Sequence, residues 1–345
     1  MRDADVAGKR VLVRSDLNVP LEGGRIADDT RIRASLPTLE LLFQGGAAEV
    51  AVCSHLGRPK GADPAFAMQP VAARLGELLP DRRLQVLENT RFDPGETKND
   101  PAFARELAGG RDLYVNDAFG SDHRAHASTE AVAHLLPAYA GLLLERELAE
   151  LGRLLGEVER PFVLVSGGAK VEDKLGVLEK VGGRADTVLV GGKMAGELAS
   201  RPPLEGVDMR LPVDVVAAAG FDPDAEARTV PFDAVPEGWL DLDIGPETRR
   251  TFAEEIARAR TIFWNGPMGV FEWPRFAEGT KAVAEAVARS DAYSVVGGAD
   301  SARALTELRL ENEVSWLSTG GGAVLELLEG KNLPGVAAIP SSEDT

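Results

Sequence analysis

Polar side chains follow four apolar runs in the first half of the chain. The runs occupy residues 10–15, 49–54, 84–89 and 112–117. The polar residues at or beyond their ends are Asp16, Asn18, His55, Arg58, Asn89, Arg91, His123, Arg124 and His126. Ligands of open parallel sheets bind beyond the carboxyl ends of the strands, and guanidinium groups suit carboxylates and phosphates. With Arg31, which follows the acidic turn 28–30, these residues predict a site for a small, multiply anionic molecule.

Glycine clusters follow five apolar runs in the second half. The five segments are 162–170, 187–195, 261–269, 293–301 and 314–323, and we expect each to turn helical after its glycines. Glycine lets the backbone turn sharply and approach a ligand closely, and N–H groups at helix starts favour phosphate. The second half therefore predicts a nucleotide site built mainly from backbone.

These groups need a scaffold that brings strand ends together. Apolar runs alternate with amphipathic segments such as 34–43, 70–79 and 101–108, which predicts α/β architecture with parallel sheets. A length of 345 residues exceeds the usual single core, so two domains are expected. Leucines at helical spacing predict a connecting helix over 141–158, and 236–248 is expected to be an irregular, strand-containing linker.

Composition restricts the class of partner. The net charge of −17 argues against nucleic acid as the main partner, since such surfaces are usually basic. No apolar stretch is long enough to span a bilayer, and the N-terminus lacks the apolar core of a secretory signal. The one cysteine, Cys53, excludes an intrachain disulfide and is expected to be a small buried residue. We therefore expect a cytoplasmic protein with no membrane association.

Long motifs run through the chain in a fixed order. They are VLVRSDLNVP (11–20), DDTRIRASLPTL (28–39), SHLGRPKG (54–61), LENTRFDPGETKND (87–100), NDAFGSDHRAHAS (116–128), GGAKVEDK (167–174), LDIGPET (242–248), WNGPMGVFE (264–272) and STGGGAVLELLEGKNLPGV (318–336). In these motifs and their order, over roughly residues 6 to 338, the chain closely resembles the phosphoglycerate kinase family.

The resemblance implies two doubly wound, Rossmann-like lobes joined by a hinge helix. It implies an N-terminal lobe (1–145) for 3-phosphoglycerate or 1,3-bisphosphoglycerate, a hinge helix (146–158) and a C-terminal lobe (159–334) for ADP or ATP with Mg²⁺. The segment 335–345 is expected to return toward the N-lobe. The reaction implied is reversible transfer of the acyl phosphate of 1,3-bisphosphoglycerate to ADP after hinge closure, and a monomer is the family expectation.

The resemblance also implies roles for the polar residues of the N-lobe. Asp16 and Asn18 are expected at the substrate's hydroxyl and carboxylate end, and Arg31 on the phosphoryl group in flight. The residues expected to hold the substrate's phosphate and carboxylate are His55, Arg58, Arg91 and Arg124, with His123 and His126 close by.

In the C-lobe, Lys170 and Lys174 are expected four residues apart on one face of the helix after Gly167-Gly168. Lys174 and the amides of Gly320 and Gly321 are expected to neutralise the transferred group, and Asp300 to bind magnesium. The other positions implied for nucleotide binding are Gly168, Ala169, Gly191, Gly192, Asn265, Gly269, Val270, Glu272, Gly298 and Ser301.

The sequence departs from the family in several places. Short segments replace an additional strand and helix between Leu79 and Leu84, and a long helical crossover between Ala199 and Leu211. The usual phenylalanine after GGxMA is absent. Asp122 replaces a small residue, where its carboxylate would lie near the substrate's charges or pair with Arg124. Ala299 replaces the third glycine of the usual GGGD, which would be strained if the position required a positive φ.

Three other functions deserve comparison. A nicotinamide dehydrogenase would show G-x-G-x-x-G at the first helix, and a P-loop kinase G-x-x-x-x-G-K-[ST]; neither occurs at a strand end. A non-catalytic relative kept as a binding protein is the third alternative. Intact Arg31, Lys170, Lys174 and Asp300 argue against it.

Overall fold

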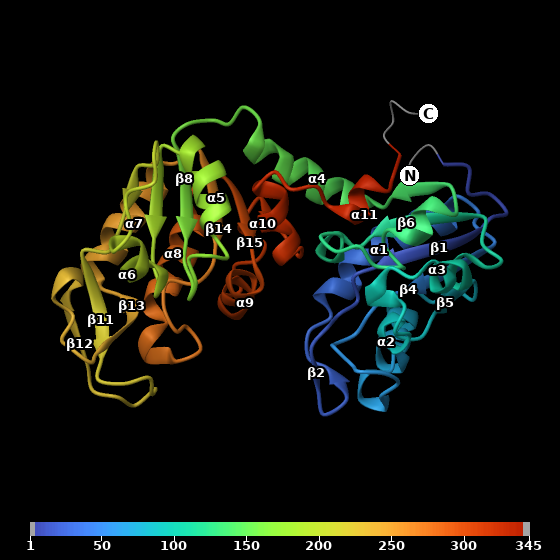
Figure 1. Cartoon of the computed structure of the whole chain (residues 1–345), viewed down its shortest axis with the longest axis horizontal. Coiled ribbons are helices and arrows are strands. Elements are labelled where there is room, and N and C mark those ends of the chain that lie inside the picture. The colour runs from blue at the N-terminus through green and yellow to red at the C-terminus, as the bar shows by residue number, and fades with distance from the viewer. Residues whose placement is uncertain (1–3, 341–345) are drawn as a thin grey trace. The chain divides into compact units, whose positions relative to one another are not determined.

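The computed structural model of the protein describes residues 4–340. The described chain divides into two compact units: unit 1 comprises 4–149 and 332–340, and unit 2 comprises 150–331 (Figure 1). Within the described residues, no helix is both long and apolar enough to cross a membrane.

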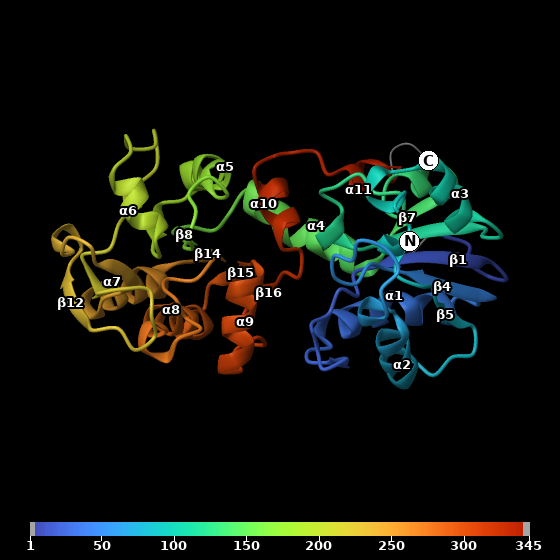
Figure 2. The ribbon, with the colours of Figure 1, turned by 60° about the horizontal axis from the view of Figure 1, so that its bottom comes forward.

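A five-stranded parallel sheet forms the centre of unit 1. Its order is β5-β4-β1-β6-β7, and the strands span Leu84–Val86, Glu49–Cys53, Arg10–Ser15, Leu113–Asp117 and Ala138–Ala140. The predicted helices are present as α1 (Thr30–Gln44), α2 (Gln69–Leu78) and α3 (Pro101–Ala108). Figure 2 shows α1 and α2 on one face of this sheet and α3 on the other.

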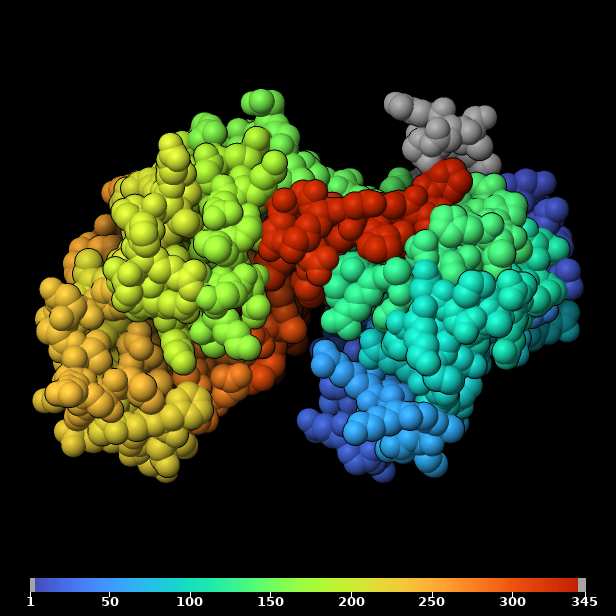
Figure 3. All heavy atoms as spheres, viewed as in Figure 1, coloured from blue at the N-terminus to red at the C-terminus, as the bar shows by residue number. Residues whose placement is uncertain are grey.

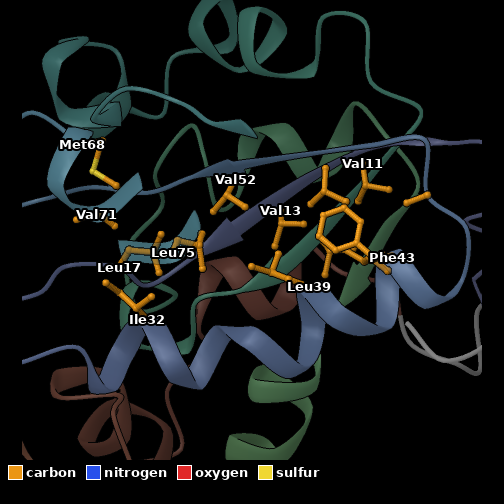
Figure 4. Packing of buried hydrophobic residues seen from close by; sticks show 14 of the residues in the cluster. Val11, Val13, Leu17, Ile32, Leu39, Phe43, Val52, Met68, Val71 and Leu75 are labelled. Atoms are coloured by element: carbon orange, nitrogen blue, oxygen red, sulfur yellow. The ribbon is translucent and has the colours of Figure 1, made fainter. Parts of the chain in front are cut away.

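The core of unit 1 explains this layering. Val11 and Val13 of β1 and Val52 of β4 point to the face covered by α1 and α2 (Figure 4). The alternate residues Leu12 and Cys53 belong to a second cluster that includes α3. Because successive strand residues point to opposite faces, strands that are apolar throughout must be covered on both sides. Cys53 is a buried free thiol, as predicted.

Unit 2 contains a six-stranded parallel sheet. Its order is β10-β9-β8-β14-β15-β16, and the strands span Met209–Arg210, Thr187–Val190, Phe162–Ser166, Thr261–Asn265, Tyr293–Gly297 and Trp316–Leu317. Its helices are α5 (Leu175–Lys180), α6 (Met194–Ala199), α7 (Pro246–Arg258), α8 (Glu278–Arg289), α9 (Ala299–Leu308) and α10 (Gly322–Leu328). The predicted fold class, two α/β units with parallel sheets, is confirmed.

A second, antiparallel sheet in unit 2 was not predicted. It has the order β12-β11-β13, from Ala227–Pro231, Asp214–Ala218 and Leu240–Ile244. The strand expected within 236–248 is β13, but the prediction of an irregular linker was wrong, since β13 pairs with β11 and α7 begins at Pro246. The short alternating sequence LDLDI carries too weak an apolar signal to reveal its pairing.

The predicted connecting helix is α4 (Leu142–Leu155), and the Asp117 carboxylate accepts hydrogen bonds from the Leu143 and Leu144 amides at its start. The last described residues fold onto unit 1 as α11 (Pro334–Ala337), where the Gly335 amide donates to the Asp122 carbonyl oxygen. Figure 3 shows this segment, in red, lying on the green and cyan surface of unit 1.

Candidate functional site

The strand ends of unit 1 are aligned by the sheet register. Arg14 of β1 pairs with Cys53 of β4 on one side and with Asn116 of β6 on the other. Segments that follow these strands therefore leave the sheet at the same edge, as the sequence predicts. The predicted polar residues of all three segments belong to this edge.

Arg31 and Asp16 form an ion pair at this edge. Arg31 lies in the first turn of α1, and its Nη1 donates to the carboxylate of Asp16, which is almost fully buried. Burial alone would raise the pKa of Asp16, but the positive charge of Arg31, helped by that of Arg14, outweighs it and leaves this pKa below its ordinary value. Arg31 is thus held beside an ionised carboxylate.

Asn18 and Arg91 meet at Gly57. The Gly57 amide donates to Asn18 Oδ1 at 2.8 Å, and Arg91 Nη1 donates to the Gly57 carbonyl oxygen at 2.5 Å. Gly57 has a φ of 63°, and a Cβ there would overlap the ring of Phe66, so a side chain would disrupt this turn. The loop that carries Arg58 is thereby tied to two neighbouring strand ends.

The basic groups of unit 1 lie within electrostatic reach of one another. Burial lowers the pKa of Arg91, and Arg14, Arg124 and Arg58 lower it further. Arg58 and Arg124 are exposed, whereas His123 is partly buried. Repulsion among cations that stand close together is relieved when an anion binds between them. His126 is buried, and burial lowers its pKa to about 4.

Two residues of this site were not predicted. Arg14 is completely buried and donates to Ser128 Oγ at 2.8 Å and toward His55 Nδ1 at 3.0 Å. Glu96 is also completely buried and accepts from the Ser128 hydroxyl at 2.6 Å. Arg14 stands inside an apolar run, which is a signal for a buried and therefore bonded guanidinium. The sequence around Glu96 shows no comparable signal.

His134 is exposed and pairs with Glu130 at 3.1 Å. Asp122 does not pair with Arg124, which was one of the two alternatives expected for it. Its carboxyl is fully buried and accepts from Asn116 Nδ2 at 2.8 Å, and burial raises its pKa to about 8.

In unit 2, four neighbouring strands end level with one another. Asn265 pairs with Ser166 on one side and Gly297 on the other, and Ser166 pairs with Val190 of β9. The glycine turns that follow pack tightly: the Gly192 amide donates to the Met268 carbonyl oxygen at 2.9 Å.

Close backbone approach explains several of these glycines. A Cβ at Gly192 would lie 2.8 Å from the amide nitrogen of Gly168, and one at Gly191 would lie 2.5 Å from the Met268 sulfur. One at Gly269 would overlap the carboxyl of Asp243. Asp243, a further residue that was not predicted, is buried, which raises its pKa to about 7, and it accepts from the Gly279 and Ile244 amides.

The predicted helix with Lys170 and Lys174 on one face is absent. The helix α5 begins at Leu175, and residues 167–174 form turns in which the Lys174 amide donates to the Val171 carbonyl oxygen. Val171 is the only fully buried residue of 169–174, so a helix there would bury little apolar surface. Lys170 and Ala169 are exposed.

Lys174 in unit 2 has a lowered pKa. Burial lowers its pKa to about 8, although the charges of Asp300 and Asp173 oppose the shift. A Cβ at Gly266 would lie 3.3 Å from its Nζ, so the ammonium group stands beside the glycine turn after β14. A half-buried ammonium near exposed Asp300 is a candidate phosphate contact.

The turn after β15 begins α9. Gly298 has a φ of 93° and precedes Ala299, the first residue of the helix. Ala299 is not among the described residues with positive φ, so its replacement of glycine causes no backbone strain. Ser301 accepts from the Gly266 amide at 2.7 Å, and Asn265 Nδ2 donates to the Gly297 carbonyl oxygen at 2.9 Å.

The remaining predicted residues follow β14 or precede α10. The Val270 amide donates to the Leu242 carbonyl oxygen, and exposed Glu272 pairs with Arg303 at 3.8 Å. Gly321, with a φ of 55°, precedes α10, and the Gly320 amide donates to Ser318 Oγ at 3.1 Å.

A magnesium ion would find one carboxylate here. Within residues 4–340 no cluster of three or more His, Cys, Asp and Glu side chains could hold a metal by itself. Exposed Asp300, in the first turn of α9, fits an ion that takes its other ligands from nucleotide oxygens and water.

Comparisons with known proteins agree on one family. The sequence model of the phosphoglycerate kinase family matches residues 1–87, 79–202 and 195–331. A phosphoglycerate kinase of Rubrobacter xylanophilus is 54% identical over an alignment of 387 positions that covers 100% of this chain and 98% of the relative. One of Roseiflexus castenholzii is 48% identical and covers 98% of each chain.

Solved structures give the same answer. The phosphoglycerate kinase of Coxiella burnetii superimposes with a TM-score of 0.86 at 38% identity, and that of Pyrococcus horikoshii with 0.85 at 31%. Each comparison covers 98% of both chains. The two sequence alignments, of 387 and 388 positions, are longer than this 345-residue chain, so those relatives carry segments that it lacks. By sequence and by structure, the chain belongs to the phosphoglycerate kinase family.

Proposed function

We propose that the protein catalyses the reversible transfer of the acyl phosphate of 1,3-bisphosphoglycerate to ADP, giving 3-phosphoglycerate and ATP. One observation supports this most directly. Two sets of aligned strand ends exist, one guanidinium-rich in unit 1 and one glycine-rich in unit 2. The guanidinium groups of unit 1 suit a multiply anionic acid, and the glycine turns of unit 2 suit a nucleotide.

In the proposed assignment, the residues that hold the phosphoglycerate are those of unit 1: Asp16, Asn18, Arg31, His55, Arg58, Arg91, His123 and Arg124. The nucleotide lies against the residues of unit 2: Gly168, Ala169, Lys170, Lys174, Gly191, Gly192, Asn265, Gly269, Val270, Glu272, Gly298, Asp300 and Ser301. Asp300 would hold magnesium, which when bound neutralises charge on the nucleotide phosphates.

The chain's own residues then act by position and charge. The attacking oxygen of ADP is already ionised, so no general base is required. The P–O bond to ADP forms as the bond to the glycerate carboxylate breaks. Arg31, Lys174 and the amides of Gly320 and Gly321 offset charge on the oxygens of the group in flight, which is the main requirement of phosphoryl transfer.

Because the two sets of residues belong to different units, the proposal requires the units to close together during turnover, with α4 and the segment after Gly335 as hinge parts. Small-angle scattering should show contraction only with both ligands present. Equal contraction with nucleotide alone would contradict this step. We further propose that the protein acts in the cytoplasm as a monomer, without nucleic acid or membrane partners.

A coupled assay with 3-phosphoglycerate, ATP and magnesium tests the function. We expect NADH consumption through an added dehydrogenase that reduces 1,3-bisphosphoglycerate. Omission of 3-phosphoglycerate should abolish the signal. If both ligands bind by calorimetry and no turnover occurs, the protein is a non-catalytic binding relative.

A further inference from the structure

The guanidinium of Arg14 uses all of its hydrogens within unit 1. It is completely buried, and a guanidinium carries five N–H donors and no acceptor. Its Nε donates at 2.8 Å, and each of its two Nη atoms faces two acceptors. The five acceptors are the Ser15 carbonyl oxygen, Ser54 Oγ, His55 Nδ1, Ser121 Oγ and Ser128 Oγ.

The contact with His55 fixes the state of the imidazole. Arg14 Nη2 lies 3.0 Å from His55 Nδ1. Since Arg14 can only donate, Nδ1 must accept and carries no hydrogen. We infer that Arg14 holds His55 as the neutral tautomer with its hydrogen on Nε2, so that His55 provides a hydrogen-bond donor and no charge.

The other side of Arg14 is anchored by a buried acid. Ser128 Oγ accepts from Arg14 Nε and donates to Glu96 Oε1 at 2.6 Å, while Glu96 Oε2 accepts from the Ser128 amide at 3.0 Å. The Thr90 hydroxyl also donates to Glu96, at 3.1 Å. Glu96 therefore balances the buried cation through one serine and fixes the orientation of the guanidinium plane.

The surroundings of His55 act in the same direction as this geometry. His55 is buried, and burial is the largest cause that lowers its pKa. Arg14 is the second cause, and Arg91 and His126 lower it further. Asp16 opposes these effects and is outweighed, so the pKa of His55 lies well below the ordinary value.

The functional consequence rests on the proposed function. In that site His55 offers its Nε2–H to a carboxylate or phosphate oxygen and carries no charge itself. Arg14 is then a positioning residue, because it acts on the substrate through the imidazole of His55. Affinity for 3-phosphoglycerate should be free of any contribution from protonation of His55.

The tautomer can be measured without substrate. The full chain, with its four histidines labelled with ¹⁵N, is examined by long-range ¹H–¹⁵N correlation spectra, and His55→Gln identifies the His55 signals. We expect a bare Nδ1 and a protonated Nε2 from about pH 5 to 8, the range in which ordinary imidazoles titrate. A hydrogen on Nδ1, or conversion to imidazolium within this range, would overturn the inference.

Arg14→Met tests the cause. We expect both neutral tautomers of His55 to appear, because nothing then donates to Nδ1. Arg10→Met, which removes an exposed arginine at the start of the same strand, should leave the His55 signals unchanged. If Arg14→Met fails to fold, the wild-type spectrum still decides. A bare Nδ1 in a protein that shows no turnover would refute the proposed function and leave this inference standing.

Discussion

The backbone of Gly335 lies directly on the carboxyl group of Asp122. The Gly335 amide donates to the Asp122 carbonyl oxygen at 3.0 Å, and Asn116 Nδ2 donates both to the Gly335 carbonyl oxygen at 3.2 Å and to Asp122 Oδ1 at 2.8 Å. A Cβ at Gly335 would overlap this carboxyl group. The segment 332–340 is thus docked on the turn that precedes His123 and Arg124.

Gly335→Ala should loosen this docking. Overpacking of a buried contact costs about 1–3 kcal/mol, so amide hydrogen exchange of residues 333–340 should speed up by about ten- to a hundredfold. Gly76→Ala is the control, because a Cβ at Gly76 in α2 meets nothing within 4 Å and alanine favours the helix. Unchanged exchange in Gly335→Ala would contradict the packing argument.

Asp122→Asn should stabilise the protein in a pH-dependent manner. Burial raises the Asp122 pKa from 3.8 to about 8, so between these values the folded state holds a proton that the unfolded state has lost. Stability contributed by this proton is complete below pH 3.8 and declines as pH rises toward about 8. The Asn variant lacks this decline. The difference in free energy of unfolding between Asp122→Asn and the wild type should therefore grow by up to about 1.4 kcal/mol for each pH unit between 3.8 and about 8.

Urea unfolding at several pH values measures this difference. Asp117 and Asp243 also have raised pKa values, but both proteins share them and they cancel from the comparison. An advantage of Asp122→Asn that stays constant from pH 5 to 8 would show that the carboxyl is ionised in the folded protein.

Arg31→Ala should remove most of kcat while nucleotide affinity stays nearly intact. Arg31 belongs to unit 1, and its guanidinium is held beside Asp16 for the proposed contact with the group in flight. Arg33→Ala, two residues along α1 and exposed, is the control and should retain full activity. Survival of turnover within about tenfold, which is 1.4 kcal/mol of barrier, would remove Arg31 from the mechanism.

Strand ends were the part of the site that sequence could predict. Continuous apolar runs such as 10–15 and 261–265 are typical of parallel strands, and the residues after them meet because the register aligns their ends. The position of Lys174 was predicted less well. A pattern of charged residues at helical spacing is compatible with a turn when one apolar residue, here Val171, is all that the segment buries.

Supporting contacts escaped prediction because they depend on long-range packing. Glu96 and Ser128 are 32 residues apart and meet only through the fold. The family pattern marked Asp122 as unusual, but its burial depends on the segment around Gly335, which is distant in sequence. The antiparallel sheet around β11 likewise joins short strands that lack a strong apolar period.

Lys174 should give an alkaline limb in the pH profile of kcat/KM. Burial lowers its pKa to about 8, so above this value the free enzyme loses the positive charge proposed to face the phosphates. In Lys174→Arg this limb should disappear, at the expense of a lower maximum, since the guanidinium is larger and stays charged. Lys180→Met, an exposed position on α5, should keep the wild-type limb. A limb that persists in Lys174→Arg belongs to another group.

Stability should favour glycine at position 298 and alanine at position 299, so exchanging the two residue types should destabilise the protein at either position. Gly298 has a φ of 93°, and a Cβ there would lie 2.8 Å from Asn265 Nδ2, so Gly298→Ala should cost at least about 1–2 kcal/mol of stability. Ala299 has no positive φ and opens α9, so Ala299→Gly gains nothing and loses up to about 1 kcal/mol of helix propensity.

The kinetics of the two variants test whether this turn serves the nucleotide. Ala299→Gly should stay within about twofold of wild-type kcat/KM for ATP. At an exposed helix start we expect the activation free energy to change by less than about 0.5 kcal/mol. Gly298→Ala should raise KM for ATP more than KM for 3-phosphoglycerate, because it displaces Asn265 and the start of α9 in unit 2 alone. A gain of activity in Ala299→Gly would mean that the family's third glycine is needed for a conformation that this turn adopts only during turnover.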